Sequence, residues 1–138
     1  MRILALDVGE KRIGVALSDP TGLLATPLTT IERKGQDSDI DAALRLATEH
    51  EVGEIVVGLP LSMSGRRGPQ AGRVDAFVRA LAERTDIPLK SVDERLSSVQ
   101  AERMLRESGV EPSKNKARID SAAAAIILQS YLDSMRIT

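Results

Sequence analysis

The sequence predicts an α/β protein built on a mixed five-stranded sheet, with its elements in the order βββ-α-β-α-β-α-α. Three strand-like segments joined by short turns fill residues 2–31, which suggests an antiparallel meander. Strands and helices alternate after them, a pattern typical of parallel strands joined by crossover helices. The length of 138 residues suits one domain. We therefore expect three antiparallel strands followed by two parallel strands, in a single domain over residues 1–138.

Each element is predicted from the spacing of its apolar residues and from the turns beside it. The first two strands are almost wholly apolar, and the turn between them contains Gly9. The third contains Pro27, which sheets tolerate at an edge or a bulge. The helices have apolar residues at helical spacing, and the third ends before Gly109, a typical residue after a helix. The predicted strands are 2–7, 13–18, 24–31, 54–58 and 88–93, and the predicted helices are 39–50, 70–84, 97–108 and 117–132.

The composition excludes several kinds of chemistry. The chain has no cysteine, so a thiol nucleophile, a Cys-based zinc site, an iron–sulfur cluster and a disulfide are ruled out. Its one histidine, His50, lies in an acidic stretch and is expected to face solvent at a helix end. There is no P-loop motif, no stretch of about 18 apolar residues and no signal-peptide pattern. We expect a cytoplasmic protein without a membrane partner, whose chemistry depends on carboxylates, hydroxyls, backbone groups and Arg or Lys.

Charge is spread unevenly along the chain, although the net charge is only −1. Residues 32–54 hold seven acidic and three basic residues, so the remainder has a basic excess. Two stretches are basic without local acids, at 66–73 and 114–118. Clustered basic charge is compatible with a nucleic-acid partner even when the total is near neutral.

Three acidic positions interrupt otherwise apolar elements. Asp7 ends the first strand, on the same face as alternate apolar residues before it. Asp93 and Glu94 end the fifth strand, and as neighbours they point to opposite faces. Asp120 opens the apolar stripe of the last helix. Each has an ordinary explanation when taken alone: a turn cap, a polar strand end, or an acid that suits the first turn of a helix.

Together the three positions predict a metal site. Two strand ends and one helix start can gather carboxylates at one end of the sheet, where they repel each other unless a cation intervenes. Mg²⁺ or Mn²⁺ suits such oxygen ligands. Two such ions about 3.5–4 Å apart can activate a water and stabilise the leaving oxygen of a phosphodiester. The residues leave open whether one ion or two would bind.

The sequence resembles the YqgF-type (RuvX-like) proteins, a bacterial family with a ribonuclease-H-like fold. Its members are described as Holliday junction resolvases and as nucleases of pre-16S rRNA. The sequence departs from the family at Ser97-Ser98, where the family usually has two threonines. The matching segments follow the family's order over nearly the whole chain: Leu6-Asp7-Val8-Gly9, Lys11-Arg12-Ile13-Gly14-Val15-Ala16, Val57-Gly58-Leu59-Pro60 with Gly65, Val92-Asp93-Glu94-Arg95-Leu96, and Ile119-Asp120 with Ala122-Ala123.

The resemblance implies a ribonuclease-H-like fold with helices on both faces of the sheet. It also implies that Asp7, Glu94 and Asp120 are the catalytic, metal-binding acids, with Glu94 rather than Asp93 facing the site. Basic residues near these acids are then candidates to hold a phosphate backbone without specifying sequence, although each is also explained as a solvated surface charge. The candidates are Lys11, Arg12, Arg66, Arg67, Arg73, Arg95, Lys114, Lys116 and Arg118.

The favoured hypothesis is a Mg²⁺- or Mn²⁺-dependent nuclease that processes the 5′ end of pre-16S rRNA in ribosome biogenesis. The first alternative is a resolvase of branched DNA, the Holliday junction, and the second is a non-catalytic RNA-binding factor in ribosome assembly. An actin-like phosphatase is disfavoured because the chain is too short for that two-domain fold. The expected partners are nucleic acid and the ribosomal particle, and the protein is expected to act as a monomer or a homodimer.

Overall fold

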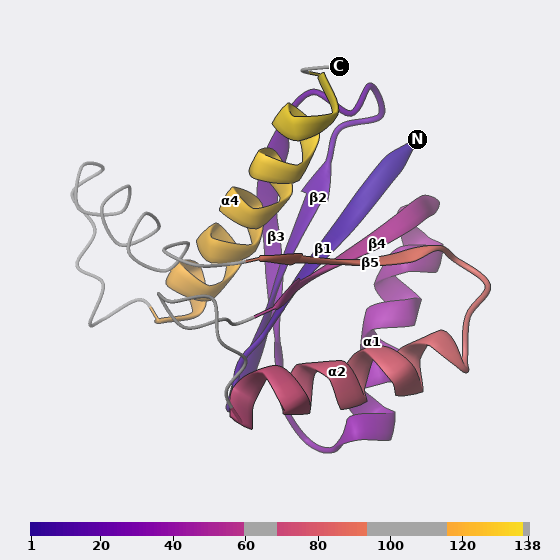
Figure 1. Ribbon diagram of the computed structural model, residues 1–138, viewed down its shortest axis with the longest axis vertical. Coiled ribbons are helices and arrows are strands. Elements are labelled where there is room, and N and C mark those ends of the chain that lie inside the picture. Colours follow the sequence, from indigo (N-terminus) through magenta and orange to yellow (C-terminus); the bar gives the residue numbers. More distant parts are fainter. Residues whose placement is uncertain (60–68, 94–115, 137–138) are drawn as a thin grey trace.

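The computed structural model contains a central sheet with helices packed on both of its faces (Figure 1). It describes residues 1–59, 69–93 and 116–136. The predicted helix at 97–108 lies outside these residues. The described elements are β1 (Arg2–Val8), β2 (Arg12–Ser18), β3 (Ala25–Glu32), α1 (Gln36–Glu49), β4 (Val52–Leu59), α2 (Pro69–Ala82), β5 (Leu89–Asp93) and α4 (Lys116–Arg136).

The sheet has the mixed topology that the sequence predicts. Its described strands lie in the order β3-β2-β1-β4-β5. β2 pairs antiparallel with both β1 and β3, while β4 pairs parallel with both β1 and β5. The carboxyl ends of β1, β4 and β5 therefore lie at the same edge of the sheet. This is the edge at which Asp7 and Asp93 occur in their strands.

The two faces of the sheet are covered by different helices. Leu4, Leu6 and Val8 of β1 pack in a core with α1 and α2. The alternate residues Ile3 and Ala5 pack in a second core with α4, on the opposite face (Figure 1). Because both faces of β1 are buried, its sequence is apolar at almost every position, as is typical of strands inside a two-sided α/β sheet.

The edge strand β3 accommodates the proline at the position where the sheet can tolerate it. Pro27 pairs with Ala16 where the β2–β3 register shifts. A proline has no N–H to give to a ladder, so an edge strand with a local irregularity is the expected place for it. The prediction for this segment is confirmed.

Helix α1 begins at Gln36, earlier than the predicted residue 39. Asp39 is buried within the first turn with only 1% of its surface exposed. Its carboxylate accepts hydrogen bonds from the Lys34 backbone N–H at 3.0 Å and from Arg33 Nε at 3.1 Å. Asp39, expected to be the first residue of the helix, is instead its fourth, and the Arg33 guanidinium compensates its buried charge.

The last helix also extends beyond its predicted end at 132, and α4 continues to Arg136. Its buried residues follow the predicted stripe, with Ala123, Ala124 and Ile127 facing the sheet. Among the described residues, no helix is long and apolar enough to cross a membrane.

Glu51, the second residue after α1, offers a test of the local geometry at the end of this helix. Glu51 has a φ of 53°, which lies in the left-handed region. This conformation is energetically unfavourable for any residue that has a Cβ atom. Replacing Glu51 by Gly should raise the free energy of unfolding by about 0.5–1 kcal/mol, because glycine adopts this conformation without the steric cost. Glu51→Ala is the control, since it removes the side-chain charge and keeps the strain. Equal stabilities of the two variants, measured by urea unfolding, would contradict this account.

Candidate active site

Asp7 lies near the carboxyl end of β1, on the face of the sheet that α4 covers. The residues at alternate positions before it, Ile3 and Ala5, pack in the core with α4, and alternation along a strand sends Asp7 to the same face. Its register partner on β2 is Gly14. Asp7 is half-buried, so its carboxylate lies where the core meets solvent.

Asp120 reaches the same surface from the beginning of α4. Gly14 brings the two acids together, because it is the partner of Asp7 and also lies directly beneath the backbone of Asp120. A Cβ atom added to Gly14 would lie 2.0 Å from the backbone oxygen of Asp120, far closer than atoms can approach. The absence of a side chain at this one position therefore lets α4 approach β2 and places Asp7 and Asp120 on one surface.

Arg12 provides a positive charge at this surface. Its Nε donates to Asp120 Oδ2 at 2.9 Å, and the two side chains are 21% and 32% exposed. Arg12 is the first residue of β2, so the pair joins the start of that strand to the start of α4. The contact of Arg12 with phosphate stays a prediction, while the structure shows that Arg12 forms an ion pair with Asp120.

The turn after Asp7 is held from several sides. Gly9 N–H donates to the carbonyl oxygen of Arg12 at 2.9 Å, which closes the turn. Arg33 Nη1 donates to the carbonyl oxygen of Gly9 at 3.0 Å, and Gln70 Nε2 donates to that of Val8 at 3.2 Å. These bonds tie the turn to the residues just before α1 and to the start of α2, so the strand end that carries Asp7 has a defined position.

Two of the predicted phosphate-binding residues lie at or beside this turn. Lys11 is exposed within it. Arg73 of α2 contacts Glu10 of the turn at 3.3 Å, with the two side chains 63% and 74% exposed. Pairs as exposed as this contribute little free energy, so the guanidinium is available to exchange its partner for a phosphate.

The structure describes several other predicted site residues only in part or not at all. For two of them, Lys116 and Arg118, the structure places the backbone in α4 on the same helix as Asp120. Asp93 pairs with Leu59 of β4 at the edge where β1 ends. The remaining predicted residues lie outside the described residues: Glu94, Arg66, Arg67, Arg95 and Lys114.

Of the three acids predicted to bind a metal ion, the structure describes two, Asp7 and Asp120. Within residues 1–59, 69–93 and 116–136, no group of three His, Cys, Asp or Glu side chains is close enough to hold a metal ion. The two described members of the predicted trio, Asp7 and Asp120, offer carboxylate oxygens, which suit Mg²⁺ or Mn²⁺. The chemistry of this donor pair fits such an ion, and Arg12 shows that the surface accommodates positive charge.

Sequence analysis missed the residues that hold the site together. Gly14 carried a usable signal, since a glycine inside an apolar strand often marks a close approach of another backbone. Arg33 and Gln70 carried none, because their roles depend on which segments the fold brings beside the turn.

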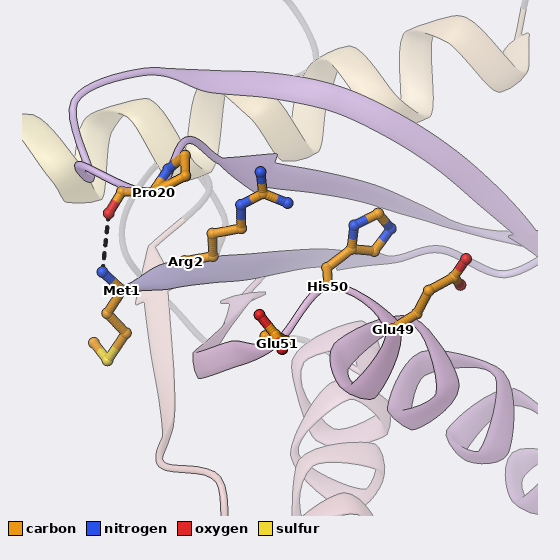
Figure 2. Close-up of a pocket in the computed structure, with 6 residues that line it drawn as sticks. All are labelled: Met1, Arg2, Pro20, Glu49, His50 and Glu51. Carbon is orange, nitrogen blue, oxygen red and sulfur yellow. Dashed lines mark hydrogen bonds between the residues drawn. The ribbon is translucent and has the colours of Figure 1, made fainter.

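A pocket of about 370 Å³ lies at the opposite end of β1 and provides a contrast (Figure 2). His50 caps the end of α1 there, at the helix end where the sequence predicts it, and is half-buried. The amino group of Met1 donates to the carbonyl oxygen of Pro20 at 2.9 Å. The pocket contains none of the predicted site residues. It is lined by Met1, Arg2, Pro20, Glu49, His50 and Glu51.

Comparison with solved structures identifies the class of fold. The chain is similar to the fowlpox virus resolvase in complex with Holliday junction DNA, with a TM-score of 0.60 and 13% identity over 98% of this chain and 99% of that one. It is also similar to RuvC from T. thermophilus bound to a Holliday junction substrate, with a TM-score of 0.61 and 16% identity over 100% and 98% of the two chains. These likenesses show the ribonuclease-H-like α/β fold that the sequence predicts.

The family follows from sequence. Residues 1–134 match the family model described as "RuvX: Holliday junction resolvase", and the chain belongs to this family. A relative from Roseiflexus sp. (strain RS-1) is 53% identical over 98% of this chain and 96% of its own length. Another from Desulforamulus reducens is 48% identical over 97% of this chain and 98% of its own. Both relatives carry the name "Putative pre-16S rRNA nuclease".

Replacing Gly14 by Ala tests the contact that brings the two acids together. The added methyl group would meet the carbonyl of Asp120, which is backbone and cannot rotate away, so α4 must shift. We expect the free energy of unfolding to fall by about 1–3 kcal/mol, the usual cost of overpacking.

Gly72→Ala is the matched control for this substitution. Gly72 lies in α2 with no atom within 4 Å of a Cβ added there, so alanine should stabilise the helix by about 0.5–1 kcal/mol. If Gly14→Ala is as stable as the parent protein, α4 does not lie as close to β2 as the structure indicates.

Proposed function

We propose that this protein is a divalent-metal-dependent nuclease whose substrate is the 5′ end of pre-16S rRNA. The observation that carries the proposal is the placement of Asp7 and Asp120 on one surface, at the edge of the sheet where β5 also ends. Membership of the RuvX family and the names of the relatives support the same class of reaction.

In this proposal Asp7, Glu94 and Asp120 hold the ion. Bound there, Mg²⁺ or Mn²⁺ supplies a Lewis acid for the phosphodiester and for the attacking water. Two of the three carboxylates, those of Asp7 and Asp120, belong to residues that the structure describes. Hydrogen bonds hold the turn that follows Asp7. Fixed ligands matter because a site that is already positioned loses little free energy to reorganisation during the reaction.

The basic residues around the site position the nucleic acid. Lys11 and Arg73 lie at or beside the turn that follows Asp7, and Lys116 and Arg118 precede Asp120 on α4. Contacts from such residues to phosphates fix the position of a nucleic acid and do not select its sequence. Binding that depends on them should weaken steeply as salt concentration rises.

A second candidate function is resolution of Holliday junctions. It is favoured by the description of the family model and by the likeness of the fold to junction-bound resolvases. We favour RNA because the relatives named for pre-16S rRNA are about half identical over nearly the whole chain, whereas the resolvase structures are 13% and 16% identical.

A cleavage assay with two substrates tests the proposal. An RNA that spans the 5′ end of the pre-16S rRNA and a four-way DNA junction are each incubated with Mg²⁺ or Mn²⁺. We expect cleavage of the RNA that a chelator abolishes. Preferential cleavage of the junction would replace RNA with branched DNA as the substrate. Binding of RNA without cleavage would favour the assembly-factor alternative.

Replacing Asp7 by Asn should lower the cleavage rate by more than about 100-fold while the protein stays folded. Even residues that merely orient a metal ligand contribute about 10–100-fold, so loss of a ligand should cost at least as much. Asp86→Asn is the matched control, because Asp86 is exposed and lies just before the amino end of β5, whereas the site lies at the carboxyl ends of the parallel strands. Cleavage by Asp7→Asn at the parental rate would refute the assignment of Asp7.

A further inference from the structure

The ion pair between Arg12 and Asp120 joins two residues that lie 108 positions apart in the chain. Its geometry is that of a charge-assisted hydrogen bond, with 2.9 Å between Nε and Oδ2. The carboxylate that accepts this bond is one of the proposed metal ligands. A positive side chain and a metal ion are therefore alternative partners for the same negative charge.

We propose that Arg12 is the built-in counter-ion of Asp120, and that it competes with the metal ion and so sets the metal affinity of the site. This inference rests on the proposed function only in taking Asp120 as a metal ligand. The guanidinium compensates the carboxylate when no ion is bound. An ion that coordinates Oδ2 would displace this contact, and an ion that coordinates the other carboxylate oxygen would still meet the repulsion of the guanidinium.

The position of Arg12 makes it a strong competitor. The backbone carbonyl of Arg12 accepts the hydrogen bond from Gly9 N–H that closes the β1–β2 turn, and Arg12 pairs with Glu32 of β3. The backbone that carries the guanidinium is therefore fixed. Both partners of the ion pair are largely shielded, with 21% and 32% of their side chains exposed. Water screens such a pair less than a fully exposed one.

Two other ion pairs show why this one matters for the site. Arg73 and Glu10 are more than half exposed, and neither is a proposed metal ligand. Arg84 pairs with Asp41 between the end of α2 and α1, on the face of the sheet opposite α4. Arg84 is therefore a matched reference: an arginine in an ion pair that the metal site does not involve.

The test is a titration of the metal-free protein with Mn²⁺, in which free Mn²⁺ is measured by electron paramagnetic resonance. Arg12→Gln should bind Mn²⁺ about 3- to 10-fold more tightly than the parent protein, since the competing charge is gone. Arg12→Lys should fall between them, because lysine keeps the charge and loses the fixed fork of the guanidinium. Arg84→Gln should bind as the parent does. Thermal unfolding in a chelator confirms that each variant is folded.

The outcomes separate this inference from the proposed function. Weaker or unchanged Mn²⁺ binding by Arg12→Gln, in a protein whose cleavage still requires Mn²⁺, would overturn the competition and leave the nuclease proposal standing. Absence of Mn²⁺ binding in the parent protein and all variants would overturn both. Tighter binding by Arg12→Gln together with parental binding by Arg84→Gln would support the competition.

Discussion

The close approach of α4 to β2 at Gly14 is the constraint on which the candidate site depends. A side chain at this position would collide with the backbone of Asp120, so the absence of a Cβ sets how near the helix can lie. The alanines of α4 and Ala16 of β2 continue the same tight packing further along the helix. The packing of small residues on this face therefore determines where Asp120 lies relative to Asp7.

Charge around the β1–β2 turn completes this arrangement. Arg33 bonds both the buried carboxylate of Asp39 and the carbonyl oxygen of Gly9, so one guanidinium links the start of α1 to the turn after Asp7. Arg12 links the other side of the same turn to Asp120. Two arginines to which the sequence analysis assigned no structural role thus link two helices to the turn at the end of β1.

The sequence predicted the described strands, helices α1, α2 and α4, and the mixed sheet, because apolar runs and helical spacing are local properties of the chain. It also identified Asp7 and Asp120 as exceptional, since each interrupts an apolar stripe. It could not predict the burial of Asp39, which depends on Arg33 folding over it. Nor could it predict the pairing of Arg12 with Asp120, because that contact arises only once the register of β1 and β2 and the packing of α4 are set.

Above all, we propose that Asp7 and Asp120, distant in sequence, bind the same divalent ion. A crystal structure of the protein grown with Mn²⁺, with anomalous scattering recorded at the manganese edge, tests it most directly. We expect an anomalous peak in contact with carboxylate oxygens of both residues. A peak bound by only one of them, or a peak elsewhere on the molecule with this surface empty, would contradict it.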